Sequence, residues 1–84
     1  MKLVFSENAW EDYLYWRKTA RKAVLRINEL IRNVQEDPFD GIGKPEPLRH
    51  ALTGYWSRRI TDEHRIGYEV EGEAVMIAQL RYHH

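Results

Sequence analysis

The period of the apolar residues changes about halfway along this chain, and this change constrains the fold more than any other feature. In the first half, five apolar residues recur at the three- and four-residue steps of one helix face: Val24, Ile27, Leu30, Ile31 and Val34. After residue 54 the period becomes two, so that Trp56, Arg58 and Ile60 share one face of a predicted strand. The chain is therefore expected to combine packed helices with a sheet.

The first half predicts one short strand and two helices. Lys2 to Phe5 is expected to form the strand, and Ser6 is a suitable N-cap for a helix that has Glu7 in its first turn. We expect Thr19 to cap a second helix that runs to about Glu36. Because so few residues separate the two helices, they should pack against each other as a hairpin. Packing or a dimer contact best explains the aromatic residues of the first helix: Trp10, Tyr13, Tyr15 and Trp16.

The second half predicts three strands, at residues 55–61, 64–70 and 74–81, with a hairpin turn at residues 71–73. Ile66, Tyr68 and Val70 are suited to a core beneath the helices, and the last stretch is apolar on both faces, as a central strand is. We therefore expect one α+β domain over residues 1–84, in which an N-terminal strand and a two-helix hairpin pack on a twisted, mainly antiparallel sheet.

Between the two halves, residues 37–47 hold all three prolines and two of the five glycines, so an irregular loop is expected. Loops of this length often carry functional residues. Pro45 and Pro47 flank Glu46 and restrict its backbone, which favours an orientable carboxylate over a floppy one. An exposed glutamate is nevertheless more often only solvated.

The charges of the chain balance overall but not locally. Thirteen basic and thirteen acidic residues give a net charge of zero, so net charge alone does not indicate a nucleic-acid partner. Between Lys44 and Arg65, however, five cations stand against three anions, and four of the cations are arginines, which favour bidentate phosphate contacts. The chain has no cysteine, which excludes disulfides and thiolate metal sites. No segment approaches the ~20 apolar residues of a membrane span, which predicts no membrane association. The apolar run at residues 1–6 is too short for a signal peptide, and the lack of cysteine suits a reducing compartment, so we expect a cytoplasmic protein.

The run GKPEPLRHALTGYWSRRITDEHRIGY at residues 43–68, together with the closing RYHH, resembles the YoeB-type toxins of the RelE/ParE superfamily. Residues 6–10 and 12–16 resemble the same family, so the resemblance extends over nearly the whole chain. It implies a RelE-like fold, akin to microbial ribonucleases, and a toxin held inactive by a YefM-like antitoxin. Such a toxin forms a homodimer and, once released, cleaves messenger RNA in the A site of the bacterial 70S ribosome.

The same resemblance implies roles for individual residues. Glu46 would be the general base that takes the proton of a 2'-hydroxyl, Arg65 would stabilise the pentavalent phosphorane, and His83 would protonate the departing 5'-oxygen. A carboxylate, a guanidinium and an imidazole are suited to these steps. Three further cations are expected to contact phosphate or ribosomal RNA: Lys44, Arg49 and Arg59. His84, where relatives commonly have tyrosine, would stack on or orient the substrate, and no cofactor or metal is implied.

Other functions and roles are open at this point. A toxin of the same fold could act by binding a target without catalysis, as ParE-type relatives do, although Glu46, Arg65 and His83 together argue against it. The chain could also be an interaction module for an antitoxin or for DNA, yet it lacks a helix with a distinctly basic face. Arg58, on the core-side face of its strand, is expected to be structural. His50 and His64 are expected to be solvent-exposed, and the spacing of the histidines does not support a metal site.

Overall fold

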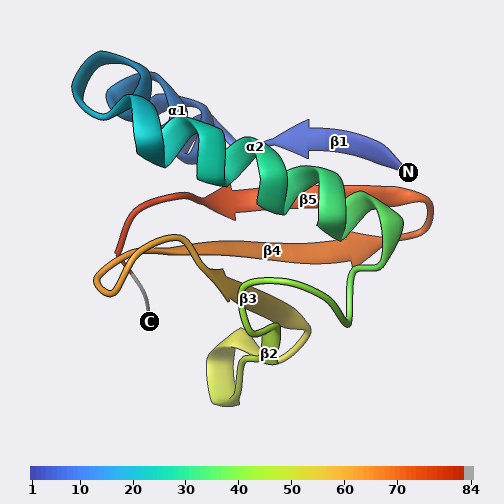
Figure 1. The fold of residues 1–84 in the computed structure, drawn as a ribbon. Coiled ribbons are helices and arrows are strands. Elements are labelled where there is room, and N and C mark those ends of the chain that lie inside the picture. The colour runs from blue at the N-terminus through green and yellow to red at the C-terminus, as the bar shows by residue number, and fades with distance from the viewer. Residues whose placement is uncertain (83–84) are drawn as a thin grey trace.

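Two α-helices and a five-stranded mixed sheet form the protein, which confirms the predicted α+β architecture (Figure 1). The computed structural model describes residues 1–82. In chain order the elements are β1 (Lys2–Phe5), α1 (Glu7–Thr19), α2 (Arg21–Glu36), β2 (Glu46–Pro47), a short 3-10 helix (His50–Leu52), β3 (Tyr55–Arg59), β4 (Arg65–Glu71) and β5 (Ala74–Gln79). The strands lie side by side in the order β1-β5-β4-β3-β2. Only the β1–β5 pair of this sheet is parallel, so the sheet of the described chain is mainly antiparallel, as predicted.

The helix boundaries confirm one predicted cap and show that the other is wrong. Ser6 caps α1 as predicted, because its hydroxyl accepts a hydrogen bond from the Ala9 N–H at 3.0 Å. Thr19 does not cap α2 but is the last residue of α1, and its hydroxyl donates to the Tyr15 carbonyl at 2.8 Å. That bond turns the side chain back along α1. The break between the helices is Ala20, whose extended backbone provides no side-chain cap for α2.

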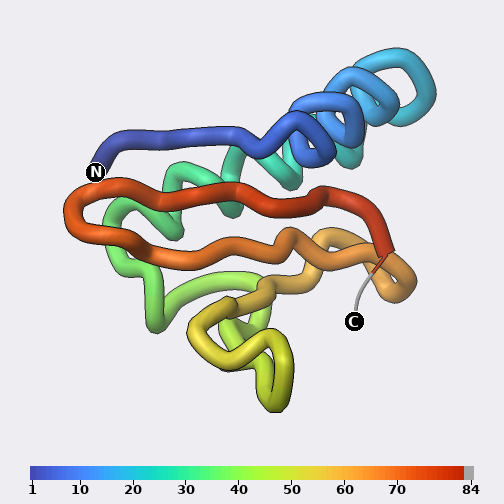
Figure 2. Tube along the Cα trace, turned by 180° about the vertical axis from the view of Figure 1, so that it is seen from behind, coloured from blue at the N-terminus to red at the C-terminus, as the bar shows by residue number. Residues whose placement is uncertain are grey.

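The core lies between α2, α1 and the inner face of the strands. Figure 1 shows α2 crossing one face of the sheet, and Figure 2 shows the strands from the opposite side. From α2 the buried side chains are Ala23, Ile27, Leu30, Ile31 and Val34, and from the sheet they include Ile66, Tyr68, Val75 and Ile77. The predicted helical period therefore identifies the buried side of α2, although Val24 is only partly buried at its edge.

The opposite face of the sheet carries a row of polar and small residues. The register pairs Glu46 with Ser57, Ser57 with Gly67, and Gly67 with Gln79 across four neighbouring strands. Because directly opposed residues project to the same side, this row lies on the face turned away from the buried Tyr68. No described helix crosses β3 or β4 on this side (Figure 2). We call it the open face.

The last predicted strand is two residues shorter than expected, since β5 ends at Gln79. From there the chain turns across the end of β4 towards the loop between β3 and β4 (Figure 1). Among the described residues, no helix is long and apolar enough to cross a membrane.

Candidate functional site

Arg65 begins β4, and its guanidinium is held in place on the open face. Its Nε donates to the Ser57 hydroxyl at 2.9 Å, and its Nη2 donates to the Lys44 carbonyl at 3.3 Å. Only 15% of the side chain is exposed. Nη1 has no hydrogen-bond partner among the described residues. The arrangement therefore fixes a positive charge at the surface and leaves a donor for an anionic ligand.

Glu46 stands beside this guanidinium. Its Oε1 lies 3.7 Å from Arg65 Nη2, and 60% of its side chain is exposed. The distance is longer than a direct hydrogen bond, so the carboxylate is an ion-pair partner that still has its lone pairs available. The roles that the family resemblance implies for Glu46 and Arg65 require the two side chains to lie close together, and this geometry meets that requirement.

The local backbone explains how Glu46 reaches that position. Sequence reasoning placed it in an irregular loop, but Glu46 and Pro47 form β2, a two-residue strand paired with β3. A strand at the edge of a sheet tolerates proline, because one side of it needs no ladder hydrogen bond. The pairing places Glu46 directly opposite Ser57, the residue that holds Arg65. Sequence reasoning missed Ser57, although the two-residue period had placed it on the face opposite to Arg58.

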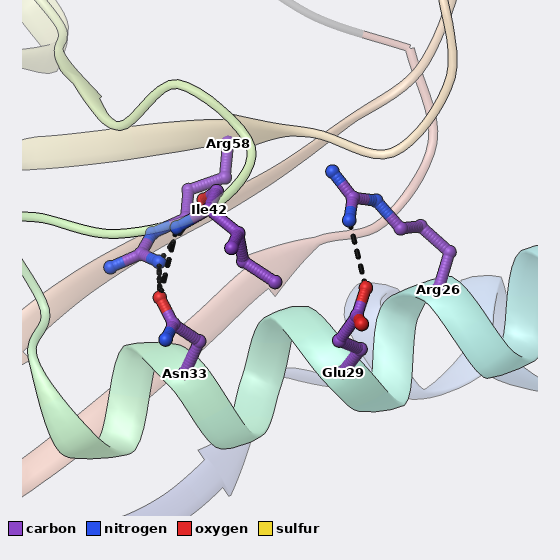
Figure 3. Close-up of polar contacts among 5 residues, drawn as sticks. All are labelled: Arg26, Glu29, Asn33, Ile42 and Arg58. Carbon is purple, nitrogen blue, oxygen red and sulfur yellow. Dashed lines mark hydrogen bonds and ion pairs between the residues drawn. The ribbon is translucent and has the colours of Figure 1, made fainter.

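The loop of residues 37–44, which leads to Glu46, is held from beneath by Arg58. This side chain is completely buried, and its guanidinium donates to the main-chain carbonyls of Ile42 at 3.2 Å and Asp40 at 3.1 Å. It also donates to the Asp37 carbonyl and to the Asn33 side-chain oxygen. Figure 3 shows Arg58 reaching from β3 to Asn33 on α2 and to Ile42 in the loop. The expectation that Arg58 is structural is confirmed.

The Arg58 contacts differ from an ordinary surface ion pair, which Figure 3 also contains. Arg26 and Glu29 pair at 2.8 Å along α2, but the side chain of Glu29 is mostly exposed. Such a pair contributes little to stability. Arg58 instead faces carbonyl and amide oxygens in the interior, where an unmatched polar group is costly.

Tyr68 completes the support of the loop. Its hydroxyl accepts from Arg58 Nε at 3.1 Å and donates to the Pro38 carbonyl at 2.7 Å. Burial raises the pKa of Tyr68 above its usual value near 10, and this effect exceeds the opposing hydrogen bond and positive charge of Arg58. The phenol therefore stays protonated at neutral pH and can keep donating to Pro38.

Two glycines allow the loop to lie so close to this support. Gly41 and Gly43 both have positive φ angles, of 128° and 79°. A β-carbon at Gly43 would lie 2.7 Å from Leu30 Cδ2, and one at Gly41 would lie 2.0 Å from Asn33 Oδ1. Both positions therefore need glycine for conformation and for space.

On the other side of Arg65, the chain after β5 is fixed through its main chain. The buried Leu80 donates its N–H to Asp12 Oδ2 at 3.0 Å, and its carbonyl accepts from Trp16 Nε1 at 2.8 Å. The Tyr82 N–H donates to His64 Nδ1 at 2.7 Å, and the Tyr82 carbonyl accepts from the Arg65 N–H at 2.8 Å. Residues 80–82, which we call the C-terminal segment, are therefore bound at both ends.

These contacts correct the interpretation of His64. The residue was expected to be solvent-exposed, but it is half-buried, and its ring meets Trp16 edge-on with 4.9 Å between the centroids. His50 is exposed, as expected. Sequence reasoning also missed Asp12, a buried carboxylate on α1. In both cases the partner is a main-chain N–H far along the chain, for which the sequence contains no pattern.

The other predicted site residues surround Glu46 and Arg65 to different degrees. Arg59 is exposed and lies opposite Arg65 in the register of β3 and β4. Lys44, which precedes β2 in the sequence, and Arg49, which follows it, are both exposed. His83 and His84 lie outside the described residues. Within residues 1–82, no group of three histidines, cysteines or carboxylates is placed to hold a metal ion.

The open face therefore offers a carboxylate that can accept a proton next to a guanidinium that can stabilise an anion. Comparison with known proteins gives this chemistry a context. The profile of the "YoeB-like toxin of bacterial type II toxin-antitoxin system" family matches residues 5–84. The Toxin YoeB of Escherichia coli K12 is 55% identical over 84 residues, which is the full length of both chains.

Solved structures agree with this match. The YoeB/ParE toxin from Agrobacterium tumefaciens superposes with a TM-score of 0.97 at 49% identity, and all of both chains is covered. A YoeB dimer and a YoeB-YefM complex from Staphylococcus aureus give TM-scores of 0.93 and 0.91 at 44% identity, covering 100% of this chain and 98% of theirs.

Proposed function

Because the chain belongs to the YoeB-like toxins of bacterial type II toxin-antitoxin systems, we propose that it is a ribosome-dependent endoribonuclease that inhibits translation by cutting messenger RNA in the A site. The observation that carries this proposal is the placement of Glu46 Oε1 3.7 Å from Arg65 Nη2 on the open face. A substrate phosphate beside Arg65 would bring the neighbouring ribose within reach of the carboxylate.

In the proposed reaction, Glu46 is the general base. Its exposed carboxylate takes the proton of the 2'-hydroxyl, and the resulting oxygen attacks the adjacent phosphorus. Pairing with β3 and the two flanking prolines hold the backbone of Glu46 in position. General base catalysis of this kind contributes about 10²- to 10⁴-fold to a rate.

Arg65 stabilises the charge that develops on the phosphorane. Its guanidinium is already fixed by Ser57 and by the Lys44 carbonyl, so little reorganisation is needed when the charge appears. The planar fork of an arginine also fits two phosphate oxygens at once, which a lysine ammonium does not.

His83 is the proposed general acid that protonates the departing 5'-oxygen. The C-terminal segment ends one residue before it, and the Tyr82 carbonyl is bonded to the main chain of Arg65 at 2.8 Å. The products are a 2',3'-cyclic phosphate and a free 5'-hydroxyl. Lys44, Arg49 and Arg59 would contact phosphate or ribosomal RNA, and His84 would stack on or orient the substrate.

The ribosome supplies substrate placement that so small a domain cannot provide alone. We propose the bacterial 70S ribosome with its message as the target and a YefM-like antitoxin as the inhibitory partner. We also propose a homodimer. The YoeB dimer and the YoeB-YefM complex from Staphylococcus aureus support these two assemblies.

Primer extension on a defined message bound to purified bacterial ribosomes tests the proposal. Wild type should cut within the A-site codon, and Glu46→Ala should lose cleavage while still binding ribosomes. Glu7→Ala, on the exposed first turn of α1, is the matched control and should cut like wild type. Absence of cleavage by folded wild-type protein, or growth inhibition retained by a cleavage-dead variant, would favour a toxin that acts by binding.

A substrate modification tests the chemistry separately. A message with deoxyribose at the cleaved position lacks the nucleophilic 2'-hydroxyl, so cleavage should stop although ribosome binding persists. Normal cutting of that message would exclude the cyclic-phosphate route.

A further inference from the structure

The ring of His64 provides a hydrogen-bond acceptor for the main chain of the C-terminal segment. Nδ1 lies 2.7 Å from the Tyr82 nitrogen, which can only donate. Nδ1 must therefore carry no proton in this structure, and the ring proton is on Nε2. The ring is oriented by its edge-on contact with Trp16, and its centroid lies 5.2 Å from that of Tyr82.

The backbone of Tyr82 shows that this contact holds a conformation that the chain would not adopt alone. Tyr82 has a φ angle of 59°, in the left-handed region that bulky residues rarely enter. Such a conformation is unfavourable for a tyrosine and persists where the surroundings impose it. Here the N–H is bonded to His64, and the carbonyl accepts from the main chain of Arg65 at 2.8 Å and from Gln79 Nε2 at 3.4 Å.

The bonds that Tyr82 makes to Arg65 and to His64 differ in whether a substitution can remove them. The Arg65 N–H belongs to the backbone of β4 and is present whatever the side chains are. The other bond depends on a side-chain atom that substitution can remove. The Tyr82 N–H and the Tyr82 carbonyl belong to the two peptide groups that flank this residue. Losing the His64 bond removes the contact that fixes the N–H of the first peptide, whose Arg81 carbonyl keeps the bond from Gln79 Nε2 at 3.1 Å.

We propose that His64 is a positioning residue for the main chain of Tyr82, the residue that precedes His83 in the sequence. The inference rests on the proposed function, in which His83 is the general acid. His64 acts through the backbone of Tyr82 and does not touch the reacting atoms. Its neighbour in sequence, Arg65, binds the phosphate, so one short stretch of chain holds both the phosphate-binding group and the main chain of Tyr82.

The main chain of that turn does not depend on the imidazole. The Ile60 and Thr61 N–H groups donate to the His64 carbonyl at 2.9 and 3.1 Å, and the His64 N–H donates to the Thr61 hydroxyl at 3.1 Å. Substitutions at residue 64 therefore change the acceptor and the packing on Trp16 while the turn keeps these bonds.

Three variants separate the acceptor from the ring. His64→Asn places an oxygen at the same number of bonds from Cα as Nδ1 but removes the ring. His64→Phe keeps a ring against Trp16 but has no acceptor. His64→Gln places its oxygen one bond further out, where it cannot occupy the Nδ1 position without moving the side chain. His83→Ala defines the cleavage rate without the acid.

Each variant is tested by single-turnover cleavage on programmed ribosomes, by ribosome affinity, and by amide hydrogen exchange at Tyr82 in the free protein. We expect His64→Asn to cleave within about threefold of wild type, and His64→Phe and His64→Gln to fall by about 10²-fold in kcat with unchanged ribosome affinity, the effect typical of a misplaced catalytic group. Protection of the Tyr82 amide should follow the same order.

The opposite order would overturn the inference: full activity and Tyr82 protection in His64→Phe, with loss of both in His64→Asn, would mean that only ring packing matters. Unchanged cleavage by all three variants would overturn it as well. Thermal melting of each variant shows whether a loss comes from unfolding. If wild type and His83→Ala cleave equally, or neither cleaves, the proposed function fails instead, and this result is distinguishable because it does not depend on residue 64.

Discussion

Two segments meet at Arg65, through the Lys44 carbonyl and the Tyr82 carbonyl, and they are held there by different means. Arg58 is the main support of the loop that leads to Glu46, with hydrogen bonds to three main-chain carbonyls of residues 37–42, and Tyr68, which is bonded to Arg58, adds a bond to Pro38. Five separate groups hold the C-terminal segment: Asp12, Trp16, His64 and the main chain of Arg65 through one hydrogen bond each, and Gln79 through bonds to the Arg81 and Tyr82 carbonyls. One support is concentrated and buried, whereas the other is distributed.

This difference determines how each segment responds when one supporting contact is removed. Removing a concentrated buried support exposes several unmatched polar groups to the interior at once, so the loop and the core should be lost together. Removing one of several distributed contacts leaves the others in place, so the C-terminal segment can loosen in steps. Stability should therefore be most sensitive at the loop, and activity should be separable from stability at the C-terminal segment.

The largest effect on stability is expected from Arg58→Met. Methionine fills a similar volume but leaves the Asp37, Asp40 and Ile42 carbonyls without their donor, which should cost about 3–5 kcal/mol in the free energy of unfolding. Urea denaturation measures this loss. Arg59→Met, at the next and exposed position of β3, is the control and should change stability by less than about 0.5 kcal/mol. Equal stability of the two variants would show that the buried contacts contribute little.

Gly43→Ala should have the next largest effect. The added methyl group would lie 2.7 Å from Leu30 Cδ2, at a backbone φ of 79° that favours glycine. Strain and overpacking together should destabilise the protein by about 2–3 kcal/mol. Gly54→Ala is a matched control, because its φ is also positive, at 102°, but nothing lies within 4 Å of the new atom. It should lose only about 1 kcal/mol. Similar losses in both variants would mean that the loop moves away from α2 freely.

Asp12→Ala tests the distributed support with a smaller expected effect. It leaves the buried Leu80 N–H without an acceptor, which should cost about 1–2 kcal/mol. Asp12→Asn keeps an oxygen at the same position and should recover most of this loss. Thermal denaturation compares the two variants, and an equal loss in both would indicate that the negative charge, rather than the acceptor, is what Leu80 requires.

The periodic parts of the molecule could be predicted from the sequence. The three-and-four spacing of Ile27, Leu30 and Val34 identifies the buried side of α2, and the two-residue period places Arg58 on the core side of β3. These predictions succeed because a regular backbone repeats its geometry, so that residue spacing alone determines which side chains share a face. The catalytic roles of Glu46 and Arg65 are implied by family resemblance and stay predictions, and the proximity that these roles require is present in the structure.

The irregular parts could not be predicted, because their partners are main-chain groups without a sequence pattern. Nothing in the spacing indicates that Arg58 binds carbonyls of the loop or that His64 binds the Tyr82 N–H. The two-residue strand β2 is too short to show a period. Thr19 was assigned as a cap because threonine suits that position, but its hydroxyl binds the carbonyl four residues earlier in α1 instead.

The smallest expected effect comes from pH and concerns the loop support. The pKa of Tyr68 is raised in the folded protein, so the folded state retains this proton at a pH where the unfolded chain loses it. Tyr68 therefore makes its full contribution to the free energy of unfolding below the ordinary tyrosine pKa near 10. This contribution is lost as the pH rises from there through the raised pKa of the folded state. The free energy of unfolding of wild type should therefore fall more steeply above pH 10 than that of Tyr68→Phe, by up to about 1.4 kcal/mol for each pH unit. Urea denaturation between pH 8 and 11 measures both slopes, and parallel slopes would mean that folding does not raise the pKa of the Tyr68 phenol.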